Sequence, residues 1–382
     1  MNKRSAVVAA LLVVVGLVLF FVRVHKEMVD FEVNYKAGLR LSWGESLYRT
    51  EDGHYQFKYP PFAAMLYLPL SICPLPTAKM IWYFLLLFAS VGVFYLVYRL
   101  STGASKIPAW LSWVPLLVLG RYFFRELQLG QINVLITFIL LAMTGLLIRS
   151  EKKSGPGAER GAGILWGLSV ALKPYALIFL PYFLLKKKFR ALSAGLAFSA
   201  IAFVLPSFFY GFSGNWTVHG EWVRSLSLST PQLLSSQDNA SLLALFTKWT
   251  GRPNLAFSLW GICLVLLVGL LWIVVRKGRT LENPIPLDCG LLLLLIPLIS
   301  PLGWDYTFLS SVLALSLISK HYFDYSVPAR IVLTLLCLVI PLSLYDLFGR
   351  HFYARFMSLS IITLCFVILA GMSVALRHKR LC

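Results

Sequence analysis

The sequence has few charged residues, and few of those are acidic. Only 13% of its 382 residues are charged, whereas about a quarter would be typical of a soluble domain. Acidic residues number 16 against 35 lysines and arginines, which gives a net charge of +19. In a soluble protein this excess would suggest nucleic acid. In a chain that is 58% hydrophobic, it indicates cytoplasmic loops and contact with anionic lipid, so membrane lipids are expected partners and nucleic acid is not.

Signatures of several enzyme classes are also missing. The chain has no Walker loop, no Gly-x-Ser-x-Gly and no His-Glu-x-x-His motif. Its six cysteines are scattered and lack metal-ligand spacing, so they are interpreted as core or lipid-facing residues. Asp-x-Asp, the usual metal-diphosphate ligand pair of nucleotide-sugar transferases, does not occur. We therefore expect no metal and no other cofactor.

Apolar runs of about 20 residues recur along the chain, and each is long enough to cross a bilayer. They predict an all-α polytopic membrane protein, one integral membrane domain over residues 1–382 with about twelve transmembrane or half-membrane segments. The first run, Ser5 to Val24, is interpreted as a retained anchor. The other expected segments are 62–73 (interfacial), 80–100, 110–120, 132–148, 161–185, 191–210, 254–275, 287–299, 306–319, 331–348 and 356–376.

The basic clusters predict the topology. Lys3, Arg4 and the tail Arg377 to Arg380 place both termini in the cytoplasm of a multi-pass cell-membrane protein. External loops are then expected at about 25–79 and 211–253, and a cytoplasmic loop at about 149–160.

Residues 161–185 leave two alternatives. One continuous helix would put the basic cluster 186–190 outside, against the charge rule, whereas a hairpin broken at Lys173-Pro174 would return it to the cytoplasm. Proline disfavours helix at the residue before it, so the hairpin, with arms of about 12 residues, is the preferred interpretation.

Polar side chains gather on the predicted external side, and ionisable groups near hydrocarbon tend to be functional. Asp30 follows the first apolar run and is the candidate catalytic carboxylate, with Glu32 as its nearest competitor. The alternatives are that Asp30 caps an interfacial helix, that Lys173, Arg121 and Arg125 extend to lipid headgroups, and that Asp305 caps a helix.

Six short elements in order resemble glycosyltransferase family 87, polytopic enzymes of the GT-C class. They are Asp30 to Gly38, Tyr48 with Phe57-Lys58-Tyr59-Pro60-Pro61, Gly130-Gln131-Ile132-Asn133, Gly167 to Pro174, Asn239-Ala240-Ser241-Leu242 and Ser300 to Tyr306. The chain departs from the family after Trp304-Asp305, where Tyr306 and Thr307 stand in place of a frequent histidine. No histidine acid or base is therefore carried over.

The resemblance implies inverting transfer of mannose or a related sugar from a polyprenyl-phosphate donor. The acceptor would be a glycolipid or lipid-linked glycan on the extracytoplasmic face. One base suffices, because the lipid phosphate leaves without an acid, and Asp30 is the candidate.

The remaining site residues, Glu32 included, are expected to bind substrate. Lys173, Arg121 and Arg125 are candidates for the lipid phosphate. Gln131, Asn133, Asn239 and Asp305 are candidates for sugar hydroxyls, and Tyr35, Tyr59 and Trp304 for flat contacts. The alternatives to an enzyme are a lipid transporter or flippase, and a non-catalytic assembly protein.

Overall fold

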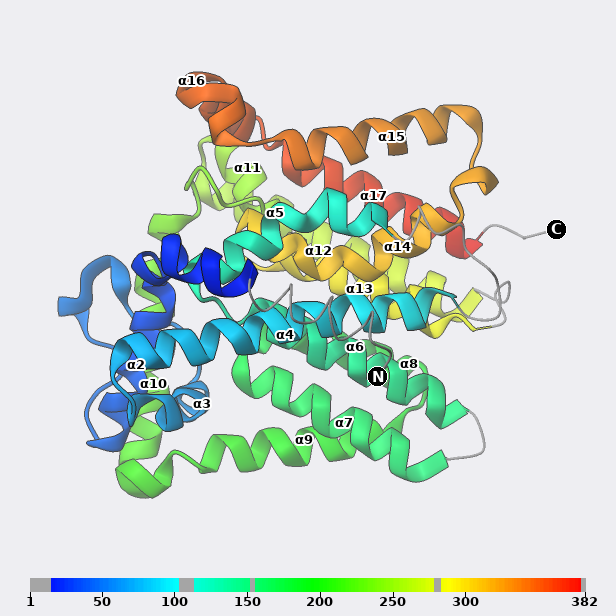
Figure 1. Cartoon of the computed structure of the whole chain (residues 1–382). Helices are drawn as coiled ribbons and strands as arrows, with labels where there is room; N and C mark the ends of the chain where they lie inside the picture. Colours follow the sequence, from blue (N-terminus) through cyan, green and yellow to red (C-terminus); the bar gives the residue numbers. More distant parts are fainter. Residues whose placement is uncertain (1–14, 103–112, 152–154, 278–282, 379–382) are drawn as a thin grey trace, which may run out of the picture.

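The computed structural model describes residues 15–102, 113–151, 155–277 and 283–378, and the regular elements in these ranges are helices. The one β-bridge in the described ranges is an isolated pair between Asn239 and Trp304. Long helices run alongside one another, and the short helices of residues 29–71 gather at one end, drawn in blue at the left of Figure 1. The predicted all-helical class is confirmed for this part of the chain.

Four described helices are long and apolar enough to cross a membrane. They are α4 (Leu75–Thr102), α6 (Asn133–Glu151), α12 (Pro253–Lys277) and α17 (Ile361–His378). Two bent pairs raise the number to six if each is one span. About twelve segments are therefore not confirmed, although most of the expected first span, Ser5 to Val24, lies outside the described residues, as does part of 110–120.

Two segments expected as single spans are sharply bent. Helix α9 (Phe189–Val204) meets α10 (Ser207–Leu233) at 93°, and α15 (Val327–Leu342) meets α16 (Tyr345–Ser358) at 105°. Pro206 lies at the first break and Pro341 lies one residue before the end of α15. Proline lacks the backbone donor that would continue a helix, which explains why each helix ends there.

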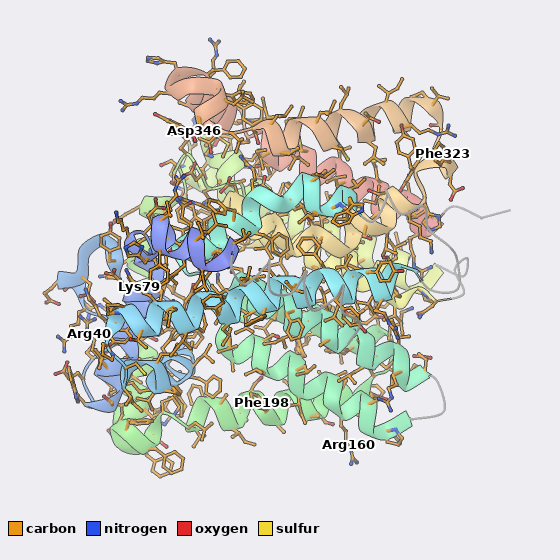
Figure 2. All side chains as sticks on the ribbon, viewed as in Figure 1. Arg40, Lys79, Arg160, Phe198, Phe323 and Asp346 are labelled. Carbon is orange, nitrogen blue, oxygen red and sulfur yellow. The ribbon has the colours of Figure 1, made fainter. Side chains whose placement is uncertain are left out.

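The segments predicted as external loops are largely helical. Residues 25–79 contain α2 (Val29–Ser42), the 3-10 helix η2 (Thr50–Tyr55) and α3 (Pro61–Ser71). Residues 211–253 contain most of α10 and also α11 (Leu242–Thr250). Helices α2, α3 and α10 lie toward the end of the molecule at which Figure 2 labels Arg40, opposite Phe323.

Residues 161–185 form a broken hairpin. Helix α7 (Gly155–Leu172) ends at Lys173, which has an extended backbone, and η4 (Pro174–Ile178) and α8 (Phe179–Leu185) follow. The chain then returns to its starting end, because the backbone N–H of Arg190 donates to Glu159 Oε1 at 3.1 Å. The first arm is 18 residues long rather than about 12, because α7 begins at Gly155, inside the predicted cytoplasmic loop.

The core lies where α13 (Ile285–Ile299), η5 (Asp305–Ser311) and α14 (Val312–Lys320) pack together with α5 (Val114–Leu129). Nearly the whole of α13 is buried, as expected of a helix that is apolar on every side. In contrast, few residues of α12 are fully buried, although it packs against α11 and, with fewer contacts, against α8 and α17. Helices α12 and α13 contribute to the same cavity.

Candidate functional site

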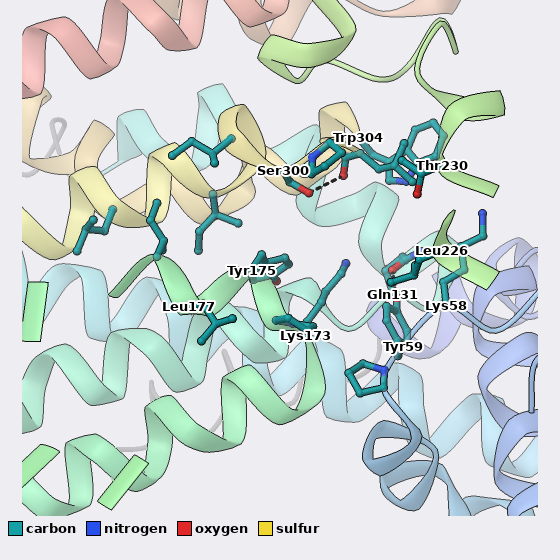
Figure 3. A pocket seen from close by; sticks show the side chains of 18 of the residues that line it. Lys58, Tyr59, Gln131, Lys173, Tyr175, Leu177, Leu226, Thr230, Ser300 and Trp304 are labelled. Atoms are coloured by element: carbon teal, nitrogen blue, oxygen red, sulfur yellow. Dashed lines mark hydrogen bonds between the residues drawn. The ribbon is translucent and has the colours of Figure 1, made fainter. Parts of the chain in front are cut away.

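A cavity of about 1250 Å³ lies between α2, the segment 55–60, the turn between α5 and α6, α8, α10, α12 and α13. Sites for ordinary small molecules measure about 300–1,000 Å³, so this one has room for a larger ligand. Figure 3 looks into it and shows Lys173, Gln131 and Tyr59 beside one another.

The lining divides into two regions. The polar end is formed by Asp30, Asn34, Lys58, Tyr59, Arg125, Gln131, Lys173, Asp238, Trp304, Asp305 and Tyr306. The apolar limb is formed by Leu177, Ile178, Leu184, Leu185, Leu264, Leu267, Val268, Leu271, Leu291, Leu292 and Ile296. Along α13 the lining residues extend from Ile299 to Asp288, about 16 Å at 1.5 Å per residue.

Asp30 lies in the first turn of α2 and lines the polar end. It is not the cap of that helix, because the N-cap residue is Met28 and no side chain caps it. The positive end of a helix dipole favours a carboxylate in this position. Gln131 Nε2 donates a hydrogen bond of 2.7 Å to Asp30 Oδ2, so the carboxylate is held at the cavity wall.

Gln131 lies in the short turn between α5 and α6 and connects three elements. Its amide oxygen accepts from the Tyr59 hydroxyl at 2.8 Å while its amide nitrogen faces Asp30. The preceding Gly130 has φ 71° and its carbonyl accepts from Trp82 Nε1 at 2.9 Å. A Cβ atom on Gly130 would lie 2.6 Å from Cβ of Phe31, so only glycine lets the turn pack this closely against α2.

Lys173 projects into the cavity from the break in the hairpin. Its Nζ donates to Asn133 Oδ1 at 2.6 Å and lies 5.2 Å from the ring centroids of both Tyr59 and Tyr175. Aromatic faces attract an ammonium group, so the two rings help to hold the cation. These inward contacts do not fit the alternative of a lysine that extends to lipid headgroups.

Asp305 follows Trp304 at the start of η5, and both line the polar end. Arg121 Nη2 lies 3.0 Å from Asp305 Oδ2, and the Arg121 guanidinium also donates to the carbonyl of Ser343. Burial raises the pKa of Asp305 to about 6, although the positive charge of Arg121 lowers it. Arg121 itself does not line the cavity and instead holds Asp305 in place.

Asn239 is fully buried and fixes the loop that carries Trp304. Its Oδ1 accepts from the backbone N–H of Gly303 at 3.1 Å, and its Nδ2 donates to the carbonyl of Pro301 at 3.1 Å. With both ends of its amide bonded to backbone, Asn239 acts on the site through the loop.

Two further cations line the polar end. Arg125 donates to Gln128 Oε1 at 2.9 Å. Lys58 lies in the segment before α3, and burial lowers its pKa while the negative charge of Asp30 raises it. Lys58 was not assigned a role from the sequence.

The structure gathers seven of the twelve predicted site residues at one cavity and places five elsewhere. The seven that line it are Asp30, Tyr59, Arg125, Gln131, Lys173, Trp304 and Asp305. Glu32 pairs with Lys79 at 2.6 Å, and the Tyr35 hydroxyl donates to the carbonyl of Cys73 at 2.8 Å. Arg121, Asn133 and Asn239 do not line the cavity, but each contacts a residue that does.

Four residues that line the polar end had no assigned role: Asn34, Lys58, Asp238 and Tyr306. Each directly adjoins a predicted residue in the sequence, so the motifs indicated the correct segments. Which neighbour faces the cavity depends on the local helix and loop geometry, and the motifs carry no signal for it.

Within the described ranges, no three histidine, cysteine, aspartate or glutamate side chains lie together in a way that would hold a metal ion. The chemistry that the polar end does offer is proton transfer at Asp30 and binding of an anion by Lys173, Lys58 and Arg125.

Comparisons with known proteins agree on one family. The model of glycosyltransferase family 87 matches residues 57–301. The chain is 26% identical over 304 residues to the polyprenol-phosphate-mannose-dependent alpha-(1-2)-phosphatidylinositol mannoside mannosyltransferase of Mycobacterium tuberculosis. The matched region covers 73% of this chain and 67% of the relative.

Two proteins of Mycolicibacterium smegmatis are also similar. The mannosyltransferase of the same description is 27% identical over 307 residues, 73% of this chain and 66% of the relative. An alpha-(1->3)-arabinofuranosyltransferase is 24% identical over 258 residues, 65% of this chain and 56% of the relative. The chain thus spans about two thirds of the length of the two mannosyltransferases. No solved structure matches it.

Proposed function

Because the chain belongs to glycosyltransferase family 87, we propose that it transfers mannose or a related sugar from a polyprenyl-phosphate donor to a glycolipid or lipid-linked glycan. The two mannosyltransferases named above depend on polyprenol-phosphate mannose, and their name gives phosphatidylinositol mannoside as the acceptor. Family membership favours transfer over the alternative of a lipid transporter.

The observation that carries the proposal is the composition of the cavity. Its polar end combines three cations, Lys58, Arg125 and Lys173, which suit a phosphate, with three carboxylates, Asp30, Asp238 and Asp305, which suit sugar and acceptor hydroxyls. The cavity continues along α13 for about 16 Å, mostly between the aliphatic side chains of the apolar limb, which suits a prenyl chain. A donor with a charged head and a long apolar tail matches both regions at once.

In the proposed step Asp30 is the general base. One carboxylate oxygen takes the proton of the acceptor hydroxyl, whose oxygen then forms a bond to the anomeric carbon. The bond from that carbon to the phosphate oxygen breaks, and the electron pair leaves with the polyprenyl phosphate. Attack from the side opposite the leaving group inverts the anomeric carbon, and the phosphate needs no proton to leave.

Lys173, Lys58 and Arg125 are proposed to bind the phosphate. Charge develops on the bridging phosphate oxygen as the bond to the sugar breaks, so fixed cations stabilise the transition state. Trp304 and Tyr59 provide flat faces for the sugar, and Asp305 an acceptor for its hydroxyls. No metal or other cofactor enters this proposal, and transfer is expected to persist in EDTA.

The polar end is proposed to face the extracytoplasmic side, with both termini cytoplasmic. The basic clusters support this orientation, since the hairpin returns residues 186–190 to the end opposite the polar residues. Arg350 lies in α16, which this orientation places outside, so Arg350→Cys should be labelled in intact cells by a membrane-impermeant thiol reagent. Labelling only after cell lysis would reverse the orientation.

The test of the base is Asp30→Asn, assayed with radiolabelled polyprenyl-phosphate mannose in the presence of membrane glycolipids. We expect kcat to fall at least about a hundredfold, because the amide cannot accept the proton. Glu32→Gln is the matched control: Glu32 lies two residues along α2, pairs with Lys79 and does not line the cavity. It should keep near-normal turnover, and the reverse pattern would make Glu32 the base.

A further inference from the structure

Glu126 is a fully buried carboxylate that does not line the cavity. It lies near the end of α5 and accepts hydrogen bonds from the start of α6. The backbone N–H groups of Asn133 and Val134 donate to Oε2 at 3.0 and 3.3 Å. The first N–H groups of a helix lack partners within it and carry its positive dipole end, so they suit a buried anion.

The same carboxylate fixes the orientation of the Asn133 side chain. Asn133 Nδ2 donates to Glu126 Oε1 at 2.6 Å. A carboxylate only accepts hydrogen bonds, so the amide NH₂ group must face Glu126 and the amide oxygen must face the opposite way. On that side the oxygen accepts from Lys173 Nζ at 2.6 Å and from the Tyr175 hydroxyl at 3.4 Å.

We propose that Glu126 is a positioning residue that, through Asn133, holds the Lys173 ammonium at the wall of the polar end, where the donor phosphate binds. The inference rests on the phosphate-binding role proposed above for Lys173. Lysine is a point charge on a flexible four-carbon chain, so its place must be set by its neighbours. An ammonium held in position before the donor arrives binds the phosphate without the cost of ordering that chain.

The experiment is a kinetic comparison of variants with polyprenyl-phosphate mannose as the donor. In Glu126→Gln an amide replaces the carboxylate, and its NH₂ group would meet the NH₂ group of Asn133. The Asn133 amide then turns, and Lys173 loses its acceptor. Loss of one charge-assisted hydrogen bond is expected to raise the donor KM roughly tenfold, with the acceptor KM changed less than about twofold.

Rescue distinguishes positioning from a merely structural role. Glu126→Gln combined with Asn133→Asp moves the carboxylate one step along the relay, where it accepts from both the new amide and Lys173. The double variant is expected to bring the donor KM back to within about threefold of the native value. A double variant that is as weak as Glu126→Gln alone overturns the inference.

Asn133→Ala provides an independent variant if Glu126→Gln does not fold. It removes the relay but leaves Glu126 bonded to the two backbone N–H groups, so the start of α6 is preserved. It should also raise the donor KM roughly tenfold, and an unchanged KM overturns the inference.

Lys173→Met separates this inference from the function on which it rests. If Lys173→Met raises the donor KM but Glu126→Gln and Asn133→Ala do not, positioning by Glu126 is wrong while the phosphate role stands. If Lys173→Met itself leaves the donor KM unchanged, both are wrong.

Discussion

Asp305 is a largely buried carboxyl group that pairs with Arg121 at 3.0 Å and also lies in the fields of Arg125 and Asp238. Since its pKa is raised to about 6, the group begins to take up a proton at a pH where most carboxylates stay ionised. Protonation of Asp305 removes the negative charge that pairs with Arg121. It also removes a hydrogen-bond acceptor for sugar hydroxyls. The rate of transfer and the stability of the fold should therefore respond to pH in opposite directions.

We expect kcat/KM to fall about tenfold between pH 7 and pH 5, because one carboxylate in eleven stays ionised at one pH unit below its pKa. Asp305→Asn should be slow throughout and lose this acidic limb. A limb that persists in the variant would belong to another group.

The stability of the folded protein should change with pH in the direction opposite to the rate of transfer. The folded protein binds the proton more tightly than the unfolded chain, whose aspartates titrate near 3.9. Asp305 therefore contributes about 1 kcal/mol more to folding at pH 5 than at pH 7. As the pH is lowered from 7 to 5, the melting temperature of the native protein should rise relative to that of Asp305→Asn. A relative fall would contradict the raised pKa.

Asp30 and Glu32 illustrate what the sequence could not resolve among individual residues. Both were assigned to an external loop, where either could face a substrate. In the structure they occupy a helix, and two positions along a helix differ by about 200°, so one lines the cavity and the other meets Lys79. The pattern that identified Asp30 was its place after an apolar run, and that pattern is equally true of Glu32.

Among the elements, the turn between α5 and α6 does most to assemble the site. It places Gln131 against Asp30 and Asn133 against Lys173 within four residues of Gly130. The turn depends on Gly130, which has positive φ and lies against Phe31 of α2.

Gly130→Ala should destabilise the protein for two reasons. A left-handed backbone costs a residue with a Cβ atom about 1–2 kcal/mol, and the clash with Phe31 adds roughly 1–3 kcal/mol. Gly251→Ala is the matched control, since Gly251 ends α11 with φ 62° and no atom lies within 4 Å of its added Cβ. Melting temperatures in detergent should fall clearly more for Gly130→Ala; equal falls would mean that α2 moves away at little cost.

Sequence patterns located the elements better than their connections. The runs 80–100, 132–148 and 254–275 correspond to α4, α6 and α12, because uninterrupted apolar residues of that length leave few alternatives to a long helix. Helices α2 and α11 were missed because their polar faces resemble loop composition, and tertiary packing decides their structure. The breaks in 191–210 and 331–348 were not predicted, although Pro206 and Pro341 stand in these runs, because packing decides whether and how far a helix bends at a proline.

For the molecule as a whole, the apolar limb predicts selectivity for the length of the donor chain. Val268 of α12 lines the limb, so Val268→Trp should obstruct it. We expect the KM for a long-chain polyprenyl-phosphate mannose to rise about tenfold, since several buried methylene groups at about 0.8 kcal/mol each lose their contacts. The KM for a short-chain analogue should change little. Val265→Trp is the control, because Val265 is 74% exposed and does not line the cavity. Equal effects on both donors would exclude a tail in the limb.

Helix α12 forms one wall of the cavity although almost none of it is buried within the protein. A wall of this kind borders lipid on its outer side, so a substrate that already resides in the bilayer can approach by lateral diffusion without passing through water. Encounter is then a search in two dimensions, and the quantity that governs saturation is the mole fraction of donor among the lipids. Diluting the donor with inert lipid at a fixed bulk concentration should slow transfer, whereas diluting the whole suspension with buffer should leave the rate per enzyme unchanged.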